Sequence, residues 1–198
     1  GLYDHMENGL RESGRDGVAF DGSRGLVNLL KKDGDTGQLA GAYNVHGINA
    51  HSMLRNENVP QEEKEMYFLE SYDAYKKAEK LCGDGESRVL VTNRASLVFE
   101  AVGIIGDAAG KYVDESISVL EKLLLQPDDK GHRFEHIRTT LADGYRLKED
   151  WEGLKRLRDE FGLNNALTYS CRYRIDYNGS TDKDEALSMI ADDLAHEI

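Results

Sequence analysis

Proline is scarce in this chain, and its scarcity constrains the fold more than any other sequence feature. The 198 residues include two prolines. Pro60 precedes QEEKEMYFLESYDAYKKAEKL, where its fixed φ angle suits a first helical turn. Pro127 follows SISVLEKLLLQ, where it closes a helix because it cannot continue the backbone hydrogen bonds. The sequence between them contains no proline, so long helices are expected there.

Apolar residues recur at helical spacing through most of the chain. Met66, Leu69 and Tyr72 follow this spacing, and Ile137 and Leu141 repeat it further on. An alternation with a period of two, which a half-buried strand requires, is not sustained in the sequence. The periodicity therefore predicts an all-α fold.

Short connections separate the expected helices, so consecutive helices should pack as antiparallel hairpins. The expected helices are Arg24–Lys32, Gln38–Arg55, Gln61–Leu81, Ser87–Ala109, Asp114–Leu125, Arg133–Leu147, Trp151–Phe161, Asn165–Tyr177 and Lys183–His196. The glycine-rich stretches Glu12–Gly25 and Asp33–Gly37 are interpreted as loops.

The stretch LADGYRLKEDWEGL, residues 141–154, has an order of large and small residues that recurs elsewhere in the chain. Leu141, Ala142 and Tyr145 are followed, after a turn, by Trp151 and Leu154. This order resembles the first helix, turn and second-helix start of a tetratricopeptide repeat. That family's unit has about 34 residues, with W-x2-L-G-x2-Y, then A-x3-F, then P.

Further segments resemble the same repeat. An early copy combines GQLAGAYNV with ESYDAYKKAEKLCGDG, and the segment 46–65 between them is an extension that the family's short turn lacks. A second copy is VGIIGDAAGKYVDESISVLEKLLLQP, and a last one begins with YRIDYNGSTDKDEA. The matching residues are Leu39, Ala40, Tyr43, Ser71, Tyr75 and Ala78 in the early copy, Val102, Gly103, Ser116 and Leu120 in the second, and Tyr173, Tyr177 and Ala186 in the last.

The resemblance implies a fold and a function. The fold is an α-solenoid of about four antiparallel helix pairs over residues 38–198, after an N-terminal loop and helix segment over residues 1–37. The implied function is a non-enzymatic scaffold that binds a peptide or protein segment in a concave groove. First helices line this groove, and the implied groove residues are Asn44, Glu100, Ile104, Asp107, His136, Thr139, Asp143 and Arg146.

The charge balance bears on the class of partner. A formal net charge of −12 without a stripe of Lys and Arg argues against nucleic acid, because binding phosphates requires clustered cations. If Glu100, Asp107 and Asp143 converge on one face, their summed field favours a basic peptide. A basic protein or peptide segment is therefore the expected partner.

The sequence leaves two alternatives to this scaffold open. HRFEH, residues 132–136, reproduces the H-x-x-E-H pattern in which two histidines bind zinc and a glutamate acts as base, which would make the chain a zinc-dependent hydrolase. We favour surface histidines here, because His132 and His136 lie off the apolar stripe. His46 and His51 are likewise interpreted as turn or contact residues. The second alternative is a sensor or oligomerisation module, with self-association, of a larger regulatory protein.

The remaining features suggest a reduced compartment. No apolar run approaches the roughly 18 residues of a membrane span, and Cys82 and Cys171 lack a zinc-binding spacing. We expect a cytoplasmic protein with no cofactor and no bound metal. The chain begins with Gly1 rather than Met, so it is expected to be part of something longer.

Overall fold

A computed structural model describes residues 15–33, 35–82, 84–126, 132–150, 152–154 and 156–157, and within these ranges it contains helices and no strands. The prediction of an all-α fold is confirmed for this part of the chain. Its helices are α2 (Asp16–Asp33), α3 (Thr36–Arg55), α4 (Gln61–Leu81), α5 (Asp84–Ile105), α6 (Asp107–Gly110), α7 (Val113–Leu124) and α8 (His132–Leu147). The expected helices Asn165–Tyr177 and Lys183–His196 lie outside the described residues.

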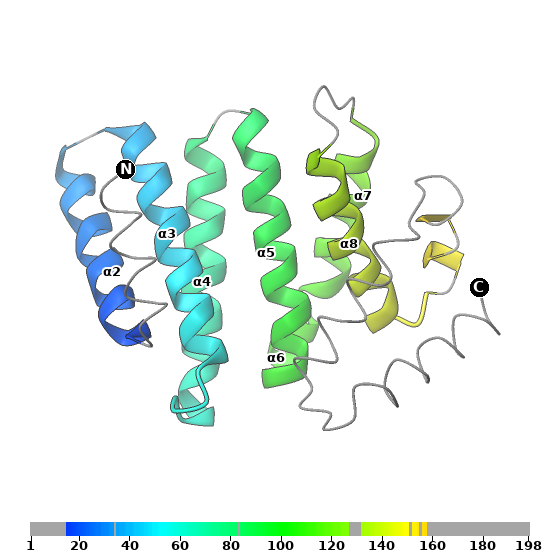
Figure 1. The fold of residues 1–198 in the computed structure, drawn as a ribbon, viewed down its shortest axis with the longest axis horizontal. Coiled ribbons are helices and arrows are strands. Elements are labelled where there is room, and N and C mark those ends of the chain that lie inside the picture. Colours follow the sequence, from blue (N-terminus) through cyan, green and yellow to red (C-terminus); the bar gives the residue numbers. More distant parts are fainter. Residues whose placement is uncertain are drawn as a thin grey trace. The chain divides into compact units, whose positions relative to one another are not determined.

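The first four of these helices pack in chain order (Figure 1). α2 contacts α3, α3 contacts α4, and α4 contacts α5. α3 also contacts α5, and the two run in the same direction because α4 returns between them. This arrangement of packed neighbours agrees with the expected antiparallel hairpins.

The chain divides into two compact units, and the division falls between Ser116 and Ile117, within α7. Helix α2 therefore shares a unit with α3, α4 and α5. No described helix has the length and apolar character needed to cross a bilayer.

The start of α2 corrects an expectation from the sequence. Glycine-rich Glu12–Gly25 was expected to be a loop, but the helix begins at Asp16. Ala19 and Phe20 are buried, and so is Val27, about two helical turns further along. Because these side chains lie at helical spacing, their burial outweighs the weak helix propensity of the glycines between them.

The turn between α3 and α4 is short, and a lysine closes it. Pro60 directly precedes α4, as its position predicted. The Lys64 side chain is buried and its Nζ donates to the Leu54 carbonyl at 2.9 Å and to the Asn56 carbonyl at 3.2 Å. These carbonyls belong to the C-terminal end of α3, which has no intrahelical partners for them. The segment 46–65 is thus lengthened helix and a five-residue connection at 56–60 rather than a long loop.

Helix α5 is shorter than expected. The sequence predicted one helix over Ser87–Ala109, whereas α5 ends at Ile105 and α6 starts at Asp107. Gly106 separates them with φ at 57°. A positive φ angle costs glycine little and costs other residues more, so the chain turns here.

The second unit contains the hairpin that LADGYRLKEDWEGL predicted. Helix α8 ends at Leu147, and helical structure resumes at residue 152. The Asp150 carboxylate accepts a 2.9 Å hydrogen bond from the backbone N–H of Gly153, which satisfies a donor in the first turn of the next helix. Tyr145 is buried, and its hydroxyl donates to Glu121 of α7 at 2.6 Å.

Candidate functional site

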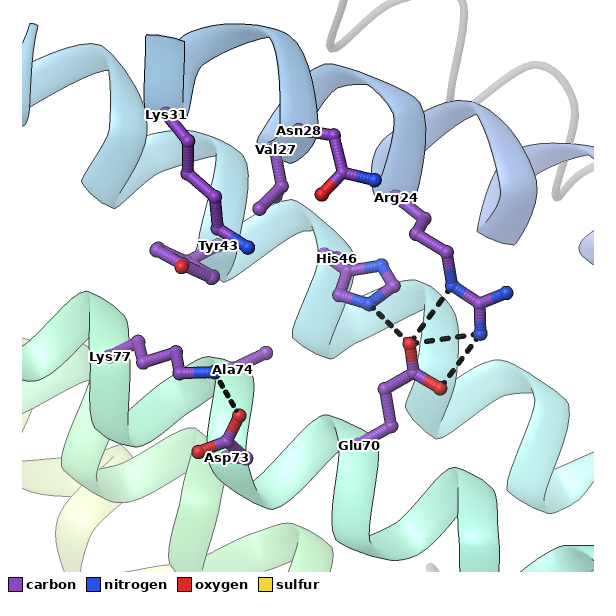
Figure 2. A pocket seen from close by; sticks show the side chains of 10 residues that line it. All are labelled: Arg24, Val27, Asn28, Lys31, Tyr43, His46, Glu70, Asp73, Ala74 and Lys77. Atoms are coloured by element: carbon purple, nitrogen blue, oxygen red, sulfur yellow. Dashed lines mark hydrogen bonds and ion pairs between the residues drawn. The ribbon is translucent and has the colours of Figure 1, made fainter. Parts of the chain in front are cut away.

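A cavity of about 210 Å³ lies over α3, between α2 and α4 (Figure 2). We name it the α2–α4 pocket. Its lining comes from three helices: Arg24, Val27, Asn28 and Lys31 of α2, Tyr43 and His46 of α3, and Glu70, Asp73, Ala74 and Lys77 of α4. The pocket is lined within the first unit, so its geometry does not depend on the second.

The floor of the pocket is built from buried side chains. Val27, Tyr43 and Ala74 are 4%, 8% and 2% exposed. They pack at the place where the three helices meet, which fixes the position of the Tyr43 ring. Polar and charged side chains form the rim, and among them Asn28 and Lys31 are exposed.

Arg24, His46 and Glu70 form one wall of the pocket, and hydrogen bonds connect them to the buried Ser23 behind it. Arg24 donates to both carboxylate oxygens of Glu70, with Nη2 at 2.9 Å from each. His46 Nε2 lies 3.0 Å from Glu70 Oε1, and His46 Nδ1 lies 3.0 Å from Ser23 Oγ. Burial lowers the pKa of His46 below its ordinary value, although the Glu70 carboxylate opposes the shift. His46 is therefore neutral at neutral pH, and its proton on Nε2 points to Glu70.

This wall has the chemical sequence of a nucleophile, a base and an orienting carboxylate. The order Ser23, His46, Glu70 would suit nucleophilic catalysis if the hydroxyl could reach a substrate. Ser23 is completely buried, however, and its hydroxyl also lies 2.8 Å from the Phe20 carbonyl oxygen. We therefore interpret the hydrogen bonds among Ser23, His46 and Glu70 as structural, because they hold α2, α3 and α4 together.

The opposite wall carries two lysines that flank one aromatic ring. Lys31 Nζ and Lys77 Nζ each lie 5.7 Å from the centroid of the Tyr43 ring, one reaching it from α2 and the other from α4 (Figure 2). This distance is within the range of a cation–π interaction. Lys77 also forms a 2.5 Å ion pair with Asp73, and this hydrogen bond raises the pKa of Lys77.

The charges of the pocket do not cancel. Its lining contains three cations and two carboxylates. Arg24 pairs with Glu70 and Lys77 pairs with Asp73, which leaves Lys31. Within the described part of the chain, Lys31 contacts the Tyr43 ring and has neither a hydrogen bond nor an ion pair.

A second histidine–glutamate–arginine cluster joins α3 to α5. His51 Nε2 lies 2.9 Å from Glu100 Oε2, and Arg55 donates to both oxygens of the same carboxylate. Burial alone would raise the pKa of Glu100, but the hydrogen bonds from His51 and Arg55 outweigh it and hold the pKa well below its ordinary value. The Glu100 side chain is 4% exposed.

The position of Glu100 corrects the expected acidic surface. The sequence placed Glu100 with Asp107 and Asp143 on one exposed face. The Glu100 carboxylate is instead buried and neutralised by Arg55, because it lies between two parallel helices. It is not available to attract a basic peptide from solvent.

The other expected groove residues of the first unit are spread over three helices. Asn44 is half-buried in the N-terminal half of α3. Ile104 is half-buried near the end of α5, where its carbonyl accepts a 2.7 Å hydrogen bond from the Gln61 side chain. Asp107 is exposed on α6. These three residues therefore come from three different helices of the first unit.

The expected groove residues of the second unit share one helix. His136 is exposed on α8, whereas Thr139, Asp143 and Arg146 are half-buried there. Their spacing of three and four residues places them along one side of the helix. Thr139 Oγ1 donates to the His136 carbonyl at 2.9 Å.

The zinc hypothesis cannot be followed through this helix. Helix α8 includes the backbone of residues 132–135, but the side chains of His132 and Glu135 lie outside the described part of the structure. Among the described side chains, no group of three His, Cys, Asp or Glu residues could hold a metal ion. The H-x-x-E-H pattern stays a prediction from the sequence.

Sequence reasoning did not find the α2–α4 pocket. Its charged residues lie far apart in the sequence, with 46 positions between the paired Arg24 and Glu70, and each alone is typical of a solvated helix face. The interpretation of His46 and His51 as contact residues that face different directions agrees with their contacts to Glu70 and Glu100. Tyr43 was matched to the repeat pattern for packing, and that signal did not indicate a pocket.

Comparison with protein-family models, with curated proteins and with solved structures finds no match to this chain. The functional argument therefore relies on the geometry of the described residues.

Proposed function

We propose that the chain is a non-enzymatic helical scaffold that binds a peptide or protein segment. The observation that carries the proposal is the direct link between α3 and α5 through Arg55, His51 and Glu100. These helices are the first members of consecutive hairpins, and the link holds them side by side in the same direction. A continuous surface across alternate helices is what a stacked array of hairpins offers to an extended ligand.

The surface beside this link is suited to such a ligand. In α3, the residues three, seven, ten and fourteen positions before Arg55 lie on the same side of the helix as Arg55. In α5, residues at helical spacing before and after Glu100 likewise lie on the side of Glu100. We name this surface the α3–α5 face. Its residues are Gly41, Val45, Ile48 and Ser52 of α3, and Val89, Asn93, Ser96 and Gly103 of α5, and all of them are exposed or half-buried.

The composition of the α3–α5 face supports peptide binding over catalysis. It combines small and aliphatic side chains with the hydroxyl groups of Ser52 and Ser96 and the amide of Asn93. Such a surface can bury apolar side chains and hydrogen-bond a peptide backbone, while the residues that define it include no acid or base that could activate its serine hydroxyls. The buried and paired Glu100 contributes no net attraction to this face, so an attraction of a basic partner to the first unit would depend on other carboxylates, such as the exposed Asp107.

Selection from a random peptide library by the whole chain tests this proposal. Peptides that are enriched should lose affinity by tenfold or more with Ile48→Arg and with Ser96→Arg, because both changes place a long cation on the α3–α5 face. Leu69→Arg is the matched control, since Leu69 is 41% exposed on α4 and lies on another helix. Thermal unfolding of each variant establishes that it is folded.

Two results would contradict the proposed function. The first is a failure of the wild-type chain to enrich any peptide sequence over repeated rounds. The second is an enriched peptide whose affinity falls equally with all three substitutions, because binding would then not be located on the α3–α5 face.

A further inference from the structure

We propose that the α2–α4 pocket is a binding site for a carboxylate group carried on a short apolar body. The ligand's carboxylate would lie near Lys31 and Lys77, and its apolar part would contact the floor of Val27, Tyr43 and Ala74. The pocket is separate from the α3–α5 face. Tyr43 and His46 project from the opposite side of α3 to Val45 and Ile48, so this site goes beyond the proposed function and does not depend on it.

The charge pattern of the pocket selects an anion. Glu70 already accepts from Arg24 and His46, and the Asp73 carboxylate is paired with Lys77. Both negative charges of the lining are therefore compensated inside the pocket. Lys31 is the remaining charge, so an incoming carboxylate would gain an ion pair without breaking one. A cation would gain no carboxylate that is not already paired.

The hydrogen-bonding groups of the pocket also suit a carboxylate. The Lys31 ammonium, the Asn28 amide and the Tyr43 hydroxyl can all donate. Within the described part of the chain, none of these three donors has a hydrogen bond to another residue. Figure 2 shows Lys31, Tyr43 and Lys77 at one end of the pocket and Arg24 and Glu70 at the other, with Asn28 on the rim beside Arg24.

The apolar floor and the volume of the pocket restrict the class and the size of the ligand further. Val27, Tyr43 and Ala74 offer an aliphatic and aromatic surface, which a fully hydrated inorganic anion would not use. A volume of about 210 Å³ is below the range of roughly 300–1,000 Å³ for sites that bind drug-sized molecules. The ligand is therefore a small organic acid or a single acidic side chain of a peptide, and both present the same carboxylate.

The aromatic floor adds to what an isolated surface lysine would offer. Lys31 and Lys77 stand over the buried Tyr43 ring, so the ligand can remove its apolar part from water while its carboxylate contacts the two ammonium groups. The contact of Lys31 with the face of the Tyr43 ring holds its ammonium group in place before the ligand binds. The ligand's carboxylate would then supply the ion-pair partner of this ammonium group. The Lys77 ammonium has three donors, so it can contact the ligand while it keeps its ion pair with Asp73.

The test uses the whole chain labelled with ¹⁵N and titrated with sodium hexanoate, with the backbone amide resonances as the readout. We expect saturable shifts at Lys31, Tyr43 and Lys77. Hexanamide, which has the same apolar body and no charge, should bind at least tenfold more weakly. A blocked peptide that contains one glutamate separates the two sources of carboxylate, because its binding at these residues identifies a peptide side chain as an accepted ligand and its exclusion identifies a free acid.

A matched pair of double variants locates the site. Lys31→Gln/Lys77→Gln should lower the affinity for hexanoate at least tenfold. Lys80→Gln/Lys122→Gln changes the net charge by the same amount at exposed positions outside the pocket and should leave the affinity unchanged. Thermal unfolding of both variants separates loss of binding from loss of folding, and a Lys31→Gln single variant replaces the double one if that variant is unfolded.

Three outcomes would overturn the proposal. They are an absence of saturable shifts with hexanoate, equal binding of hexanoate and hexanamide, and equal loss of affinity in the two double variants. None of them bears on the peptide selection at the α3–α5 face, which uses other residues and another ligand, so the two proposals can fail separately.

Discussion

Ser71 Oγ donates a 2.7 Å hydrogen bond to the carbonyl oxygen of Gly47, and this bond joins α4 to α3. Ser71 is completely buried, and a Cβ atom added to Gly47 would lie 2.9 Å from the Tyr75 ring. The side chain of Tyr75 therefore occupies the space that the glycine leaves. A small residue on each helix permits this contact.

We predict that Gly47→Ala destabilises the protein, because Tyr75 is 2% exposed and has no room to move. Gly41→Ala on the same helix is the matched control, since a Cβ there would have no atom within 4 Å. Both variants gain the helix propensity of alanine, roughly 0.5–1 kcal/mol. The difference between them reports the steric clash and should be roughly 1–3 kcal/mol by urea unfolding. Equal stabilities would mean that α3 and α4 are not held at this separation.

The sequence predicted the helices well where apolar spacing and proline agreed. The range of α4, Gln61–Leu81, was predicted to the residue, and the end of α3 at Arg55 was also correct. The start of α2 was missed because glycine content was read as a loop signal, whereas burial of Phe20 against neighbouring helices decides the outcome. Tertiary packing of this kind is not visible in a local pattern.

The candidate site could be predicted less well than the helices. Two of its ion pairs, Arg24–Glu70 and His46–Glu70, join residues of different helices. The sequence alone does not indicate which charged side chains of different helices will be in contact. Glu100 shows the difficulty, because its place on a first helix suggested an exposed carboxylate. Only the contact between α3 and α5 identifies Arg55 and His51 as its partners.

We predict that Lys64→Met destabilises the protein although methionine suits a helix. The substitution removes the two hydrogen bonds that Lys64 Nζ donates to carbonyls at the end of α3. A buried carbonyl without a partner costs roughly 1–3 kcal/mol. Lys80→Met, at an exposed position of the same helix, should change the free energy of unfolding by less than about 0.5 kcal/mol. A similar loss in both variants would show that Lys64 does not cap α3.

We predict that Glu100→Gln weakens the association of α3 with α5. Removing one member of a buried ion pair costs roughly 3–5 kcal/mol, and we expect the lower end because the Arg55 side chain is 38% exposed. Glu65→Gln, at an exposed position of α4, is the control for loss of one negative charge. The measurement is chemical unfolding at pH 7. A Glu100→Gln variant as stable as the control would remove the structural basis of the α3–α5 face.

The two buried histidines predict how stability changes with pH. Burial lowers the pKa of His46 and of His51, against the opposing effect of Glu70 and Glu100. In the unfolded chain both histidines titrate near a pKa of about 6.5, so below this pH the unfolded state binds more protons than the folded state. The free energy of unfolding therefore falls as the pH is lowered below about 6.5, and it is insensitive to these groups at higher pH.

Urea unfolding between pH 8 and pH 5.5 measures this dependence. Replacing one buried histidine by a residue that does not titrate, as in His51→Gln, should reduce the slope below pH 6.5, because the glutamine amide can donate to Glu100 without taking up a proton. The slope that remains would come from His46 and from His136, because desolvation lowers the pKa of His136 as well. Replacing His46 together with His51 should therefore weaken the dependence further. Stability that rises as the pH falls through this range would contradict the assignment of both histidines as neutral in the folded protein.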